Sequence, residues 1–383
     1  MKSKLLILTA AIMLCLPRMQ AQKNGIEWIA GPMEPFSIDK VKTTKRQTTL
    51  DMTFHANIFY ITASPRLIDQ NGAVHPLVKI KGARKGKNTT KHGVAKFSLS
   101  FSPLAPEDSI FDFVQGACRD DYGCFWGVHD KGTSIDVSAP TSRCDTSLVF
   151  SQKDKFNTCL IGHIQNKKTG IAVMTQIDLD HDRMNKRDDT VRIDESGYFV
   201  FDTKIHGPEF TYVNIPDELA WIPVLLNPND TLLCNINIPS KGVHECDYKS
   251  INGYNTCKNL MISRPTWRDF THRRLRLSEE NADMAQVFEN LKKEIDSLSG
   301  YLASKYDMSP FEYELLHIFL LEELEYEKVA SFRSKQECRT YALPEEIKTS
   351  PVRFSCYSSP YLFHVLKRCD KEGWLLPERE NLK

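Results

Sequence analysis

Two cysteines of the segment GACRDDYGCFWG, residues 116–127, lie close enough in the chain to act together. Cys118 and Cys124 could be a redox-active pair, half of a metal site or a structural disulfide. Thiol catalysis needs a lowered thiol pKa, most often in a Cys-x-x-Cys motif at a helix N-terminus, and this sequence has no such motif. A zinc site would need a second pair of comparable spacing. We therefore interpret Cys118 and Cys124 as a disulfide or as a pair of buried thiols.

A second pair, Cys246 and Cys257, occurs in HECDYKSINGYNTC and could close a loop at a domain boundary. Its spacing is a poor match to that of the first pair, which argues against a shared zinc site. An even number of cysteines remains once Cys15, within the N-terminal leader described below, is set aside. Several disulfides are expected in an oxidising compartment, although their connectivity does not follow from spacing.

A basic loop from Lys79 to His92 carries lysine and arginine but no acid. It could attract phosphate, an acidic glycan or lipid head groups, whereas charge runs are also common in solvated hairpin loops. Both interpretations stay open. The residues that we single out for binding an anionic ligand are Lys81, Arg84, Lys85 and Lys87.

The alternating acids of DLDHD, residues 178–182, are arranged as at the start of a calcium-binding EF-hand loop. Such a loop needs glycine at its sixth position and glutamate at its twelfth, where this chain has Arg183 and Asp189. A solvated hairpin loop is the better interpretation. The histidines are scattered, and neither an HExxH motif nor a GxSxG nucleophile elbow occurs. We predict no catalytic residue, no cofactor and no metal site.

Four short Asp-Ser/Thr-apolar sequences match the acceptor pattern of Bacteroidetes O-glycosylation, and we set aside Asp296-Ser297-Leu298 because it lies in a predicted helix. The acceptors would be Ser109, Thr190 and Thr231. A glycan at these positions would add bulk and solubility without implying an activity.

The first 21 residues have the parts of a secretory signal peptide, with a lysine-containing start, an apolar stretch at Leu5–Leu16 and a small residue at Ala21. The apolar stretch is too short to span a bilayer, and we expect no transmembrane segment in the mature chain. A net charge of +1 and a pI near 7.6 argue against a nucleic-acid binder. We expect export, to the periplasm or the outer membrane or beyond it.

Hydrophobic periodicity divides the mature chain into β and α parts. Residues 22–150 contain alternating segments such as KFSLSF and an Asn71-Gly72 hairpin signal, which are typical of an antiparallel β-sandwich. Residues 151–240 predict a second, small antiparallel β-sandwich module. A linker at 241–262 and an α-helical segment at 263–383 follow, where Ser309 and Glu312 form a capping box. The predicted fold class is α+β, with several domains.

The order of these parts resembles that of the exported TlpA-like disulfide reductases of Bacteroidetes, which carry a thioredoxin-fold domain. The resemblance rests on SLSFSPLAPEDSIFDFVQG, CFWGVHD, DESGYFVFD, LLNPNDTLLCNI and, most specifically, LASKYDMSPFEYELL. It implies an exported protein with two β modules and a helical segment. No thioredoxin domain with a Cys-x-x-Cys occurs before Lys383, so the resemblance assigns no catalytic residue.

The leading prediction is an exported, non-catalytic protein of the cell envelope that binds or scaffolds an envelope protein or a glycan. Two alternatives remain. The first is a thiol-disulfide oxidoreductase that uses an atypical pair such as Cys118 and Cys124. The second is an envelope glycan-binding module that uses the basic loop.

Overall fold

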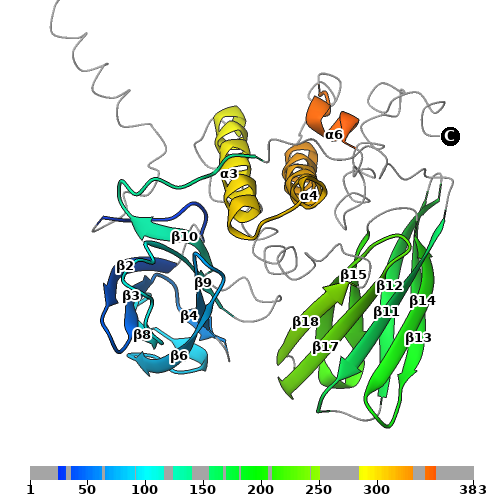
Figure 1. Ribbon diagram of the computed structural model, residues 1–383, viewed down its shortest axis with the longest axis horizontal. Helices are drawn as coiled ribbons and strands as arrows, with labels where there is room; N and C mark the ends of the chain where they lie inside the picture. The colour runs from blue at the N-terminus through cyan, green and yellow to red at the C-terminus, as the bar shows by residue number, and fades with distance from the viewer. Residues whose placement is uncertain are drawn as a thin grey trace, which may run out of the picture.

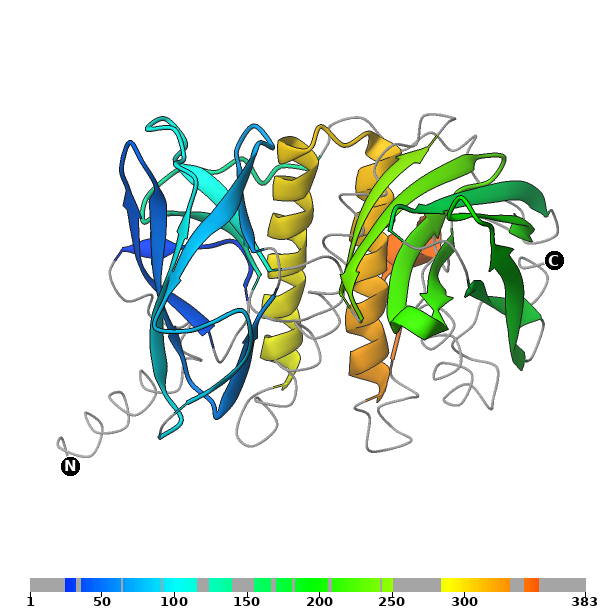
Figure 2. The ribbon, with the colours of Figure 1, turned by 90° about the horizontal axis from the view of Figure 1, so that it is seen from below.

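The computed structural model contains two β regions with helices between them, as Figures 1 and 2 show. The structure describes residues 25–31, 36–62, 65–90, 92–115, 124–139, 155–166, 170–180, 183–205, 209–241, 243–250, 284–330 and 341–350. The predicted signal peptide and the C-terminal residues after 350 lie outside this set.

The first β region is one antiparallel sheet of eight strands, in the order β1-β10-β9-β5-β6-β8-β3-β2. Its edge strands β1 and β2 contact each other, so the sheet is nearly closed. The prediction of antiparallel β structure is confirmed here, but one continuous sheet replaces two facing ones. Register shifts within β2, β6 and β10 bend the strands and allow the sheet to curl around its core. The strands are β1 (Ile26–Glu27), β2 (Phe36–Thr43), β3 (Thr48–Phe54), β5 (Arg66–Asp69), β6 (Val74–Lys81), β8 (Ala95–Phe101), β9 (Ile110–Val114) and β10 (Phe125–Asp130), with a separate pair β4 (Ile58–Ile61) and β7 (Gly86–Thr89).

Phenylalanine rings fill the interior of this sheet. The inward residues of β8, Phe97, Leu99 and Phe101, are all buried, as strict alternation predicts. Phe59 of β4 stacks on Phe97 with ring centroids 5.1 Å apart, so the two-stranded pair also packs on this core. The resulting apolar cluster is confined to the first β region.

The second β region consists of two four-stranded sheets, β14-β11-β17-β18 and β13-β12-β15-β16. One pairing differs from the predicted antiparallel pattern, because β11 and β17 run parallel. Strand β18 lies within the predicted linker and extends the first of these sheets. The strands are β11 (Phe156–Ile164), β12 (Gly170–Asp180), β13 (Arg183–Ile193), β14 (Tyr198–Ile205), β15 (Glu209–Ile215), β16 (Ala220–Leu226), β17 (Thr231–Ser240) and β18 (Val243–Ser250), with the short 3-10 helix η2 (Pro216–Glu218) before β16.

Local turn signals in the sequence correspond to turns in the structure. Asn71-Gly72 connects β5 to β6, and Gly72 has a φ of 81°, in the left-handed region that favours glycine. Asp180 pairs with Arg183 across β12 and β13, on either side of residues 181 and 182 of DLDHD, which lie outside the described residues.

The helices are α3 (Met284–Lys305), α4 (Pro310–Ala330) and the short α6 (Glu345–Thr349). The capping box before α4 is confirmed. Glu312 accepts a hydrogen bond from the Ser309 backbone N–H at 2.7 Å, and its own N–H donates to the Ser309 hydroxyl at 3.3 Å. Within the described residues, no helix is sufficiently long and apolar to cross a membrane.

Helix α3 lies beside the first β region and α4 lies on the side of the second one (Figure 2). The buried faces of both helices belong to one apolar cluster with the interior of the second β region. The outer face of the first sheet joins this cluster through Ile68, Val114 and Trp126. The helices therefore have apolar surface from both β regions around them.

Candidate functional site

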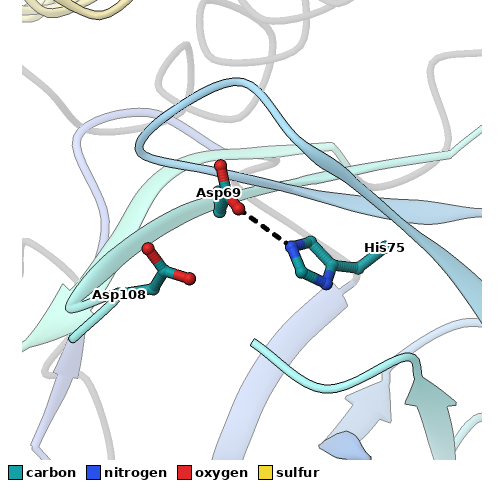
Figure 3. A group of neighbouring side chains, drawn as sticks. All are labelled: Asp69, His75 and Asp108. Atoms are coloured by element: carbon teal, nitrogen blue, oxygen red, sulfur yellow. Dashed lines mark hydrogen bonds and ion pairs between the residues drawn. The ribbon is translucent and has the colours of Figure 1, made fainter. Parts of the chain in front are cut away.

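Three potential metal ligands meet at the turn end of the β5–β6 hairpin (Figure 3). Asp69 ends β5, His75 is the second residue of β6, and Asp108 lies in the turn before β9. One ligand atom of each residue lies within 4.8 Å of the other two. Asp69 is buried, and the other two residues are half-buried. This group is the chemically richest cluster of carboxylate and imidazole among the described residues.

Backbone N–H groups hold the two carboxylates in place. Oδ1 of Asp69 accepts hydrogen bonds from the N–H of Asn71 at 2.9 Å and of Ala73 at 2.8 Å, as an Asx turn does. Its Oδ2 lies 3.0 Å from Nε2 of His75. Burial alone would raise the pKa of Asp69, but these hydrogen bonds, that of His75 first, outweigh it and hold the pKa below its ordinary value.

Asp108 has a different environment. Its Oδ2 accepts a hydrogen bond from the Ala105 N–H at 2.9 Å, which closes the turn that positions it. Its Oδ1 is buried and has no hydrogen-bond partner among the described residues. An oxygen of this kind is unusual, because buried polar atoms are normally paired.

The basic loop connects β6 to β7, and its four singled-out residues are exposed. These two strands do not pair with each other, because β6 pairs with β5 and β8 and β7 pairs with β4. We refer to this β6–β7 connection as the basic hairpin. Asn88 orders the turn, since its side chain accepts from the Arg84 N–H at 3.0 Å and donates to the carbonyls of Arg84 and Gly86. Within the described residues, no ion pair involves a cation of this hairpin. The exposed cations of the hairpin and its neighbouring strand β8 are Lys79, Lys81, Arg84, Lys85, Lys87 and Lys96.

Exposed apolar side chains occur on the strands that carry or adjoin these cations. Val74 and Val78 project from β6, and Val78 is 64% exposed. Ile58 of β4 and Val94 before β8 are also exposed. We name this surface of exposed cations and apolar side chains the basic hairpin surface.

A buried ion pair fastens α3 to the first β region. The Lys305 ammonium lies 2.6 Å from Oδ2 of Asp112 on β9, and both side chains are almost fully buried. Oδ1 of Asp112 accepts from the Tyr301 hydroxyl and the Gly127 N–H, each at 2.8 Å, and Oδ2 accepts from the Tyr306 hydroxyl at 3.2 Å. Because the charged groups are surrounded by hydrogen-bond partners, the pair meets the conditions for a stable buried ion pair.

The remaining protons of Lys305 are also used. Its ammonium donates to the Ile68 carbonyl at 3.1 Å and to the Tyr301 hydroxyl at 3.2 Å. Burial, followed by the negative charge of Asp112, raises the pKa of both Tyr301 and Tyr306 well above the ordinary value. Both phenols therefore stay protonated donors. We name Asp112, Tyr301, Lys305 and Tyr306 the α3 latch.

The predicted disulfides stay predictions, because Cys118 and Cys257 lie outside the described residues. Cys124 precedes β10, is buried, and its sulfur accepts a hydrogen bond from the Gln115 N–H at 3.4 Å. Cys246 lies on β18 and is half-buried. Cys159, which we had not singled out, has a thiol pKa raised to about 11, first by burial and then by Asp202.

The three predicted glycosylation acceptors have different exposures. Ser109 and Thr190 are exposed, the latter on β13. Thr231 begins β17, is half-buried, and its N–H donates to Asp230 at 2.7 Å. It lines a shallow hollow together with Asn157, Cys159, Asp202 and Lys204. The structure thus leaves Ser109 and Thr190 most accessible to a glycosyltransferase.

The sequence reasoning missed the cluster of Asp69, His75 and Asp108 and the α3 latch. Asp69 is recognisable as the cap of the Asn71-Gly72 turn, but Asp108 comes to it from a turn far along the chain. Asp112 and Lys305 are brought together by tertiary packing. No local spacing signals either arrangement.

Neither a known protein family nor a curated protein matches this chain. Among solved structures, it is similar to BcpA, the major pilin subunit of Bacillus cereus, with 11% identity over 55% of this chain and 71% of that one and a TM-score of 0.16. It is also similar to the Bacillus anthracis TIE protein, with 8% identity over 57% of this chain and 41% of that one and a TM-score of 0.15. At these TM-scores the similarity does not establish a shared fold.

Proposed function

We propose that this chain is an exported, non-catalytic binding protein of the bacterial cell envelope, made of an N-terminal β domain, a β-sandwich module and a helical segment. Its ligand is an anionic envelope glycan, bound at the basic hairpin surface. One observation carries this proposal: among the described residues, the exposed cations that begin at Lys79 have no acidic ion-pair partner and directly follow Val78, which is itself exposed.

The hairpin has the physical properties of a preformed anion-binding surface. Cations without an acidic neighbour attract negatively charged groups and raise their local concentration. The Asn88 hydrogen bonds order the turn that carries Arg84 and Lys85, so little conformational entropy is lost when a ligand binds. Exposed apolar side chains beside the cations add contact area for the non-polar faces of a sugar.

Neutralising two lysines tests the proposal. In cosedimentation of the protein with purified envelopes, Lys85→Gln with Lys87→Gln should weaken binding about 30-fold, because each lysine near an anionic surface contributes ~1 kcal/mol. Binding of the unaltered protein should also decrease steeply with salt concentration.

Lys249→Gln with Lys293→Gln is the matched control. Both of these lysines are exposed and lie away from the hairpin, on β18 and α3, so the change in net charge is identical. Equal weakening by both double variants would refute the hairpin as the binding surface. If the protein binds vesicles that contain phosphatidylglycerol but does not bind lipid-extracted glycan, the ligand is a lipid and the glycan proposal is wrong.

The non-catalytic part of the proposal has its own test. A catalytic thiol is accessible and has a lowered pKa, whereas Cys124 is 6% exposed. The purified protein should therefore not accelerate insulin reduction by dithiothreitol. Turnover that is lost in Cys118→Ser would instead support the oxidoreductase alternative.

A further inference from the structure

Asp69 and Asp108 each use one carboxylate oxygen for positioning, and His75 lies beside them with Nε2 3.0 Å from Asp69 (Figure 3). Oδ1 of Asp69 is fixed by two backbone N–H groups, and Oδ2 of Asp108 by one. The polar atoms without a backbone partner are Oδ2 of Asp69 and Nε2 of His75, which lie 3.0 Å from each other, and Oδ1 of Asp108. Metal sites show this same division, in which outer hydrogen bonds orient the ligands that face the ion.

The buried Oδ1 of Asp108 indicates that the group lacks a positively charged partner. It has no hydrogen-bond partner among the described residues, although it is shielded from water. Its neighbour is the carboxylate of Asp69, which belongs to the same group of ligand atoms within 4.8 Å of one another. Two carboxylates that are close together and partly buried repel each other. A cation between them would remove the repulsion and give Asp108 a partner.

We propose that Asp69, His75 and Asp108 bind a divalent transition-metal ion, with Zn²⁺ as the best match. Two carboxylate oxygens and one imidazole nitrogen suit Zn²⁺, which takes such ligands at about 2.0–2.2 Å and leaves a fourth position for water. Ca²⁺ is a poorer match because it prefers six to eight oxygen ligands. The ligand atoms lie up to 4.8 Å apart. Side-chain rotations that move each ligand atom by roughly 1 Å would close the site around an ion of this size.

The ion would join two parts of the first β region. Asp69 and His75 belong to the β5–β6 hairpin, and Asp108 belongs to the turn before β9. Binding to the folded state but not to the unfolded one stabilises a protein by mass action. Zinc should therefore raise the melting temperature of the protein. This role is independent of the basic hairpin surface.

Isothermal titration of the full chain with Zn²⁺, after removal of metal by a chelator, tests the proposal. The unaltered protein should bind one equivalent. Asp108→Asn should weaken binding at least tenfold, because the amide keeps the oxygen that accepts from Ala105 but loses the charge that faces the ion. His75→Ala should have an equal or larger effect, and neither variant should show the zinc-dependent rise in melting temperature.

His163→Ala is the control for non-specific histidine binding. His163 lies on β11, where its ring stacks on Tyr198, and its removal should leave zinc affinity unchanged. Absence of zinc binding by the unaltered protein would overturn the proposal, as would unchanged affinity in both Asp108→Asn and His75→Ala. Lys85→Gln with Lys87→Gln should keep full zinc binding, which separates this site from the proposed glycan surface.

Discussion

The two β regions are related to the helices in different ways. The first β region has an interior core of its own, and α3 is fixed to its outer face by the polar α3 latch. The interior of the second region is continuous with the buried faces of α3 and α4 in one apolar cluster. The first region therefore resembles a separately packed unit with a helix fastened to it, while the second region and the helices depend on each other.

This difference separates two kinds of stabilisation. Apolar contacts are non-directional and tolerate some rearrangement, so the shared cluster alone would allow α3 to shift along the first sheet. The latch requires a particular placement, because Lys305 and Asp112 are stable when buried only in contact with each other. We infer that the latch fixes the position of α3 on the first β region, and the shared core then fixes the second region.

Breaking the latch should have the largest effect. Asp112→Ala leaves the Lys305 ammonium buried without its counter-ion, and the free energy of unfolding should decrease by about 3–5 kcal/mol. Urea denaturation of the purified protein measures this. In amide hydrogen exchange of this variant, exchange should accelerate most in α3 and β9. The amides of the interior strands β3 and β8 should stay better protected.

A surface ion pair provides the control for this variant. Lys42 and Asp51 lie 2.7 Å apart, a distance close to that of the latch pair, but both are partly exposed. Asp51→Ala should change the free energy of unfolding by about 1 kcal/mol or less. Similar losses from Asp112→Ala and Asp51→Ala would contradict a special role for the latch.

The sequence predicted local features of both regions well and their long-range features poorly. The Asn71-Gly72 turn, the alternation of β8 and the capping box at Ser309 depend on neighbouring residues, and all three are confirmed. The nearly closed first sheet depends instead on bulges. The parallel pairing of β11 with β17 depends on how distant strands meet. Neither the bulges nor the pairing of distant strands produces a hydrophobic periodicity that can be detected in a single sequence.

The candidate sites divide in the same way. The basic hairpin could be recognised because its cations lie within a few residues of one another in the chain. The cluster of Asp69, His75 and Asp108 could not, since an aspartate that caps a turn has the same local sequence with or without a third ligand. The cluster can be detected only when the structure shows that the turn before β9 brings Asp108 beside the other two residues. Residue spacing indicates a metal site when the ligands share one element, as in zinc motifs.

A glycine-to-alanine change on α3 should have an intermediate effect. The Gly300 Cα lies against the backbone of residue 137, and an added methyl group would overlap the Val137 carbonyl oxygen. Gly300→Ala should reduce the free energy of unfolding by about 1–3 kcal/mol through this steric conflict. Alanine favours a helix over glycine by about 1 kcal/mol, so a loss in spite of this gain would be diagnostic of close docking.

The exposed Gln286 on the same helix serves as the comparison for Gly300. Gln286→Ala should stay within about 0.5 kcal/mol of the unaltered protein in urea denaturation. If Gly300→Ala is more stable than the unaltered protein, α3 does not lie as close to the segment after β10 as the structure indicates.

The smallest effect is expected from removal of the cap of α4. This change tests whether the second β region and the helices depend on each other. Ser309→Ala removes the hydroxyl that accepts the Glu312 N–H, which should cost about 1 kcal/mol. Because α4 shares its core with the second β region, hydrogen exchange should accelerate in α4 and in β17 together, while β3 and β8 of the first region stay as protected as before. Ser297→Ala, within α3 and bonded to its own helix at the Lys293 carbonyl, should change neither set. Faster exchange confined to the first turn of α4 would mean that the helix frays without loosening the sandwich, and that the shared core is less cooperative than its continuity implies.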